Sequence, residues 1–327
     1  MNQQAERSSN IISDFIESYF ERRMARILLL GMISGFPWVL IASSLSLWLK
    51  EEGLSRSTIG WAGLIFGVYA FNFLWAPLID RLRVPVLTDR LGHRKAWILI
   101  LQVVILVCIL FWSTIDPVSS LALVIGAGLV IAICSATQDI TIDALRIEQI
   151  DKDDARGMAA GAAVAVVGWW SGFKLGGMAA LFMADYLETA GVANYWQMTF
   201  IFLAVLVVLC NVGLLFIPEI GTRERVERQR QAQQAMADKM GGAGPVVQLV
   251  SFLTTTVIEP LWSFFRKNGM QIGIMILAFV FLFKIGEAFM GRMSIVFYKE
   301  VGFSKSDIAI YSKGLGWITT VVFTLIG

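Results

Sequence analysis

Two aspartates four residues apart, Asp139 and Asp143, lie in a segment that is otherwise almost uncharged, residues 121–145. This spacing places both carboxyl groups on one face of a helix. Two carboxylates so close together do not both ionise easily, so one is expected to hold a proton near neutral pH. Such residues at membrane depth mark proton relays, ligand pathways or interhelical pairs. We therefore expect proton transfer at Asp139, and for Asp143 the alternative of an ion pair with Arg146.

Three further charged residues lie deep within apolar runs: Lys174, Lys284 and Glu287. Lys174 is too deep to reach the membrane surface easily, so its ammonium needs an anion, either Asp139 or a ligand carboxylate. Lys284 and Glu287 are three residues apart and either pair with each other or divide two tasks. In that second case Glu287 takes a proton, and Lys284 and Lys174 bind an anionic ligand.

Gln138 and Trp170 are candidates for uncharged contacts with a ligand. The Gln138 side chain projects from a different face of its helix than Asp139 and could contact polar groups of a ligand. Most tryptophans lie near the ends of apolar runs, as in the interfacial belts of membrane proteins. Trp170 instead lies well inside a run beside Lys174. Its ring could stack on a sugar face, and ordinary packing is the alternative.

The composition is that of a multi-span membrane protein. Hydrophobic residues make up 57% of the 327 residues and charged residues 16%, whereas soluble domains have about 25% charged residues. The net charge of +2 gives no reason to expect nucleic-acid binding. The three cysteines fit neither a disulfide framework nor a metal site, and a single histidine, His93, cannot build a metal cluster. We expect no metal and no cofactor.

A membrane-crossing helix needs about 20 mostly apolar residues. Seven such runs are predicted, and an eighth begins near Ile308 and is still apolar at Gly327, from which we expect a fragment. The seven runs are residues 27–49, 59–79, 97–115, 121–145, 158–184, 196–217 and 270–298. The expected organisation is a cytoplasmic segment (1–26), a six-helix half (27–217), a cytoplasmic linker (218–245), an interfacial helix (246–269) and the first two helices of a second half (270–327).

Lysine and arginine counts predict the orientation in the membrane. One side of the membrane is expected to hold segments 1–26, 80–95, 146–157 and 218–269, which contain nineteen lysines and arginines. The segments on the opposite side contain five, including Arg292. The N-terminus is therefore expected in the cytoplasm. A span at 246–265 would reverse everything after it, which is why we favour a helix along the membrane surface there.

The segment between the second and third runs combines acidic and basic residues at a helix end. It reads APLIDR at 76–81 and DRLGHRK at 89–95, so an Asp-Arg pair stands on each side of an insertion. Such charges can pair or cap a neighbouring helix in one conformation and separate in another. We expect a conformational latch here, with enforcement of the positive-inside rule as the alternative. Its predicted members are Asp80, Arg81, Asp89, Arg90, Arg94, Asp143 and Arg146.

This loop resembles the signature loop of the major facilitator superfamily. Four segments further resemble the AmpG-type muropeptide permeases: SGFP at 34–37, WAPLID at 75–80, ATQDITIDA at 136–144 and KIGEA at 284–288. The resemblance implies an all-α membrane protein with a major facilitator-type helical bundle. It also implies import of anhydro-muropeptides across the bacterial inner membrane, with the proton gradient as the energy source, in a pathway that feeds β-lactamase induction. We expect the protein to be a monomer.

Two alternatives to this function remain open. A related branch carries acetyl-CoA, so another organic anion or a drug is possible as the substrate. An intramembrane prenyltransferase-type enzyme would use paired aspartates to hold a metal–diphosphate, but it needs a second acidic cluster that these helices lack. The expected partners are an anionic sugar-peptide and membrane lipid.

Overall fold

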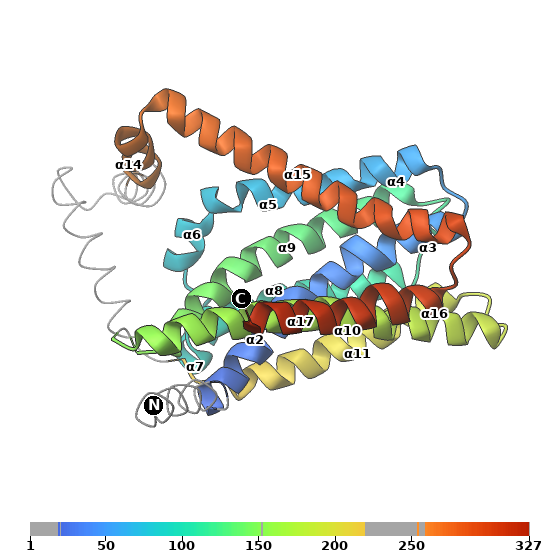
Figure 1. Cartoon of the computed structure of the whole chain (residues 1–327), viewed down its shortest axis with the longest axis horizontal. Coiled ribbons are helices and arrows are strands. Elements are labelled where there is room, and N and C mark those ends of the chain that lie inside the picture. Colours follow the sequence, from blue (N-terminus) through green and yellow to red (C-terminus); the bar gives the residue numbers. More distant parts are fainter. Residues whose placement is uncertain (1–18, 20, 152, 220–253, 255–258, 327) are drawn as a thin grey trace, which may run out of the picture.

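The computed structural model describes residues 19, 21–151, 153–219, 254 and 259–326, and the regular structure in these ranges is entirely helical (Figure 1). Seven of the described helices are long and apolar enough to cross a membrane, or eight if one bent pair forms a single span. The predicted all-α membrane bundle is therefore confirmed.

The first six spans follow the predicted ranges within a few residues. The first two are broken into short helical pieces, whereas the next four are continuous. The first span comprises α2 (Arg22–Trp38), η1 (Val39–Ser44) and α3 (Leu45–Glu51). The second comprises α4 (Arg56–Ala62), η2 (Gly63–Gly67), α5 (Val68–Phe71), η3 (Asn72–Leu74) and α6 (Ala76–Arg81). After α7 (Leu87–Leu91) come α8 (His93–Trp112), α9 (Leu121–Ile147), α10 (Ala155–Thr189) and α11 (Tyr195–Leu215).

The break in the first span has a local cause. Pro37 lies inside α2, where it has no amide hydrogen to donate and its ring crowds the preceding turn. The six residues after the end of α2 form the π-helix η1. Its wider turn lets the backbone amide and carbonyl groups pair again beyond the proline. The span therefore continues across the proline, with a local widening in its middle.

After the linker the structure describes α14 (Glu259–Asn268), which turns by 110° into α15 (Met270–Val301), the first helix of the second half. The turn is at Gly269, whose positive φ of 78° favours glycine. α14 matches the end of the predicted interfacial segment, whose place on the membrane surface stays a prediction. Most of the linker and residues 246–253 and 255–258 lie outside the described residues. The chain then forms α16 (Lys305–Asp307), η5 (Ile308–Leu315) and α17 (Gly316–Ile326).

α2 and α10 pack with their backbones in contact. A methyl group at Gly35 would overlap the carbonyl oxygen of Trp169, and one at Gly168 would overlap that of Leu28. Gly31 and Gly172 meet backbone in the same way. Small residues allow this approach between membrane helices, where dispersion contacts supply much of the association energy. The contact fixes the position of α10, which carries Trp169, Trp170 and Lys174.

We predict that Gly35→Ala lowers the stability of the protein by about 1–3 kcal/mol, because the added methyl group separates two helix backbones. Thermal unfolding in detergent measures the effect. The matched control is Gly126→Ala on α9, where the added methyl group meets open space. The control should be neutral or slightly stabilising, since alanine favours helix over glycine. Equal melting temperatures for the two variants would contradict the close contact.

Candidate ligand and proton site

Asp139 and Asp143 line one cavity of about 300 Å³ between α2, α9 and α10. Ser34 on α2 donates a hydrogen bond from Oγ to Asp139 Oδ1 at 2.5 Å. Most of the remaining wall is apolar, from Ile142, Ala162, Ala165, Val166 and Trp169. The spacing of four residues thus brings both carboxyl groups to one cavity, as the sequence predicts.

The two aspartates differ in their surroundings. Asp139 is half-buried and lies against α2, whereas the Asp143 side chain is 68% exposed and lies 3.3 Å from Arg146. This Asp143–Arg146 contact is the ion pair expected as the alternative for Asp143. Asp139 is therefore the member of the pair whose charge is less accessible to solvent.

Gln138 lies away from this cavity and connects three helices. It is fully buried, its Oε1 accepts a hydrogen bond from Gln102 Nε2 at 2.7 Å, and its Nε2 donates to the Ile33 carbonyl at 2.8 Å. Both ends of the amide are thus engaged with α8 and α2. The geometry places Gln138 as a cross-link beside Asp139, and its contact with a ligand stays a prediction.

Lys174 faces the second half of the chain. Its Nζ donates to the Ser312 carbonyl at 3.1 Å and lies 5.5 Å from the centroid of the Trp170 ring. The structure thus places Lys174 and Trp170 together, at the contact between α10 and η5. The side chains of Lys284 and Glu287 lie outside the part that the structure describes, so their expected roles stay predictions.

Lys313 is a buried cation that is missing from the predicted site residues. It is 5% exposed, and its Nζ lies 4.1 Å from the centroid of the Phe173 ring. Lys313 stands in the apolar run that begins at Ile308. A charged residue inside an apolar run is the signal that identified Lys174, and it applies to Lys313 equally.

Arg292 is a second buried cation, and it was counted only among the charges of the less basic side. It lies within α15 and is 3% exposed. Its Nε donates to Ser46 Oγ at 2.9 Å, and its guanidinium carbon lies 5.3 Å from the centroid of the Phe66 ring. Among the described residues, Nη1 and Nη2 have no hydrogen-bond partner.

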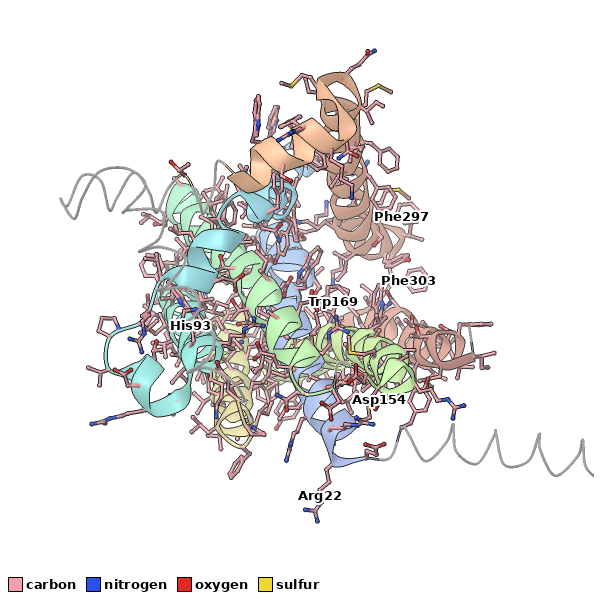
Figure 2. The ribbon with its side chains drawn as sticks, turned by 90° about the vertical axis from the view of Figure 1, so that its left-hand side faces the viewer. Arg22, His93, Asp154, Trp169, Phe297 and Phe303 are labelled. Carbon is pink, nitrogen blue, oxygen red and sulfur yellow. The ribbon has the colours of Figure 1, made fainter. Side chains whose placement is uncertain are left out.

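A connected group of rings, which we call the aromatic cluster, lies between these cations. Trp38 is at its centre, with ring centroids 4.8 Å from Phe66, 5.4 Å from Trp169 and 6.5 Å from Phe173. Tyr69 and Trp170 complete it. Viewed from one end of the bundle, Trp169 lies toward the middle while Arg22 and His93 lie at the edge (Figure 2). The cluster offers ring faces at the seam between the two halves.

Residues 27–327 match the profile of the Major Facilitator Superfamily. The chain belongs to this superfamily. It is 31% identical to the "Putative transporter AmpG 4" of Rickettsia conorii over 93% of its own length and 66% of that relative. It is also 31% identical to the "Anhydromuropeptide permease" of Escherichia coli K12, over 96% of its length and 56% of that relative. The chain thus spans less than two thirds of either protein.

These relatives confirm the resemblance to AmpG-type permeases. The superfamily match and the names of these relatives, a transporter and a permease, argue against an enzyme of the prenyltransferase type. The prenyltransferase alternative is therefore set aside. The described residues also contain no group of three or more His, Cys, Asp or Glu side chains that could hold a metal ion.

At the end predicted to be cytoplasmic, the ion pairs given by the structure lie within the first half. Arg83 lies 2.8 Å from Asp89, and Arg94 lies 3.1 Å from Glu148. Arg90 is exposed on α7, Asp80 lies in α6, and the side chain of Arg81 is outside the described part. Of the predicted latch residues, Arg94 thus connects the start of α8 to the end of α9 within one half, and a role in switching stays a prediction.

Two caps at the same end were not predicted. The Glu219 carboxylate accepts hydrogen bonds from the amides of Arg94, at 3.0 Å, and Lys95, at 2.9 Å, at the start of α8. Asp154 caps α10, because it accepts from the Gly157 amide at 2.8 Å. That hydrogen bond and the Arg23 guanidinium, 2.7 Å away, lower the pKa of the Asp154 carboxyl. These carboxylates satisfy amides that a helix start leaves unpaired.

The ion pairs that join the two halves lie at the opposite end, among the residues that the structure describes. Glu300 on α15 lies 2.6 Å from Lys50 and is also paired with Arg56. Glu51 lies 2.8 Å from Lys299 and 2.9 Å from Lys305. Lys305 Nζ also lies 2.6 Å from Glu188. We call these seven residues the cross-half network. In Figure 1 it lies where α3, α4 and α16 meet the end of α15.

We predict that Glu51→Gln weakens the association of the two halves at this end. The Glu51 side chain is 8% exposed, and the substitution removes the carboxylate that pairs with Lys299 and Lys305. Removing one partner of a buried pair costs on the order of 3 kcal/mol. Spin labels at the exposed positions Ala193 and Phe303, in a background without native cysteines, should show a longer distance population.

The matched control for this variant is Glu52→Gln, because Glu52 is the adjacent exposed acid. Its distance distribution should equal that of the unmodified protein. Identical distributions for Glu51→Gln and Glu52→Gln would show that the cross-half network does not hold this end closed.

Proposed function

We propose that the protein is a proton-coupled transporter that imports anhydro-muropeptides (GlcNAc–anhydroMurNAc peptides) from the periplasm into the cytoplasm. The permease relatives support this substrate class, and the lysine and arginine distribution supports an inner-membrane orientation with a cytoplasmic N-terminus. Such import serves cell-wall recycling, and it feeds β-lactamase induction in bacteria whose enzyme is inducible. One observation supports the proton coupling: the Asp139 carboxyl group lies at the wall of a largely apolar cavity and accepts a hydrogen bond from Ser34.

The surroundings of Asp139 suit a group that gains and loses a proton. An ionised carboxylate is costly beside apolar walls, and protonation removes that cost. The Ser34 hydroxyl can donate a hydrogen bond to the ionised Asp139 carboxylate and accept one from the protonated carboxyl group. The contact between α2 and Asp139 can therefore form in both protonation states. Protonation of Asp139 can therefore bias how the first span packs against α9.

The charges of the seam suit an anionic sugar-peptide. The Lys174 ammonium provides a positive point for a carboxylate, and the adjacent Trp170 ring provides a face for a sugar. The cross-half network joins the two halves at the end predicted to be periplasmic, which suits a conformation closed on that side. Alternating access would then proceed by parting the halves at this network while they close at the other end.

We predict that Asp139→Asn reduces gradient-driven uptake of labelled anhydro-muropeptide into proteoliposomes at least about 100-fold, the lower end of what the loss of a proton-transfer step costs. Exchange of labelled for unlabelled substrate without a gradient should persist, because the amide keeps the shape and the hydrogen bond to Ser34. Asp116→Asn, at an exposed loop acid, is the control and should transport normally.

Three results would count against the proposal. Uptake by the unmodified protein that is insensitive to a protonophore would exclude proton coupling. Normal coupled uptake by both Asp139→Asn and Glu287→Gln would remove these residues from the relay. Uptake of acetyl-CoA or a drug in place of the muropeptide would overturn the substrate.

A further inference from the structure

Two cations of the second half, Arg292 and Lys313, pack against the first half, and neither has an acidic partner among the side chains that the structure describes. The structure describes the first half from residue 21 to 219, apart from Lys152 and the side chains of Pro77 and Arg81, none of which is acidic. Within this described surface, the polar contact of Arg292 is the hydroxyl of Ser46, and that of Lys313 is the face of the Phe173 ring.

Such an arrangement is costly unless something else supplies the negative charge. A buried cation loses its water, and a ring face or a single hydroxyl replaces only part of that interaction. The cost is larger at Arg292, where two guanidinium nitrogens are buried and unpaired among the described residues. The cost of burying the Lys313 charge is also raised by the nearby Lys174 ammonium, because like charges repel.

Both cations lie on rings of the same aromatic cluster. Arg292 is over Phe66 and Lys313 is over Phe173, and Trp38 contacts both rings. The cluster therefore forms a continuous apolar surface with a positive charge at each end. A matching ligand has two anionic groups separated by a part with flat or apolar faces, such as a sugar.

We propose that Arg292 and Lys313 bind two separate carboxylates of one ligand, whose sugar part lies against the aromatic cluster. This inference rests on the proposed function and narrows its substrate class to sugar-peptides with at least two free carboxylates. Arg292 offers Nη1 and Nη2 as a planar pair of donors that fits one carboxylate in bidentate fashion. Lys313 binds the second carboxylate together with Lys174.

The position of Arg292 also indicates when it is reached. It lies seven and eight residues before Lys299 and Glu300 of the cross-half network, about 11–12 Å along the helix. Phe66, Gly63 and Ser46 cover its guanidinium in the closed arrangement. A ligand therefore reaches Arg292 when the halves part at the network, so Arg292 meets the first carboxylate of an entering ligand.

The experiment measures equilibrium binding of two probes to the purified protein: an anhydro-muropeptide with free peptide carboxylates, and the same compound with those carboxylates amidated. We expect Arg292→Gln and Lys313→Gln each to weaken binding of the acid about 10- to 100-fold, as the loss of a charge-assisted hydrogen bond does. Binding of the amidated probe should change less than about 3-fold on the same scale. Arg266→Gln and Lys267→Gln, on exposed positions of α14, are the matched controls.

Equal losses for both probes, or no loss for either, would overturn the assignment, because a structural role does not distinguish the probes. Arg292→Lys and Lys313→Arg keep the charge if a glutamine variant fails to fold, and they should retain preference for the acid. If the unmodified protein bound neither probe, the proposed function would fail. Binding of acetyl-CoA that is lost in both glutamine variants would overturn the substrate class and support the two cation sites.

Discussion

A charge that is buried between two moving bodies must find an opposite charge in each arrangement of those bodies, or bear the cost of losing water. This constraint organises the seam of the protein. At one end, acids and bases from both halves pair directly in the cross-half network. Farther inside, Arg292 and Lys313 rest on rings without an acid among the described residues. The paired charges hold the halves together, and the unpaired ones leave a positive surface for an anion.

α10 connects the parts of this arrangement. On one side its glycines bring it into backbone contact with α2, which carries Ser34 and therefore touches Asp139. On the other side it presents Trp170, Phe173 and Lys174 to η5. A shift of α10 would therefore change the surroundings of Asp139 and of the buried lysines at η5 at the same time. This shared element gives a physical route by which protonation and ligand binding could influence each other.

Hydropathy alone predicted the helices well because membrane spans depend on local composition. The run predicted at 121–145 forms α9 (Leu121–Ile147), and the shared face of Asp139 and Asp143 follows from helix geometry. Partners on other helices could not be predicted in this way. Gln138 has the character of a ligand-binding residue in the sequence, but Gln102 and the Ile33 carbonyl engage its amide. The acids that oppose Lys299 and Lys305 likewise come from distant parts of the chain.

We infer that the contact between the two halves binds an anionic sugar-peptide between the aromatic cluster and the buried cations. The most direct test is a structure of the protein determined with an anhydro-muropeptide bound. In that structure we expect a sugar ring against the aromatic cluster and a carboxylate oxygen within hydrogen-bonding distance, about 3 Å, of Lys313 or Arg292. A ligand whose carboxylates lie away from both cations, with its sugars off the rings, would contradict it.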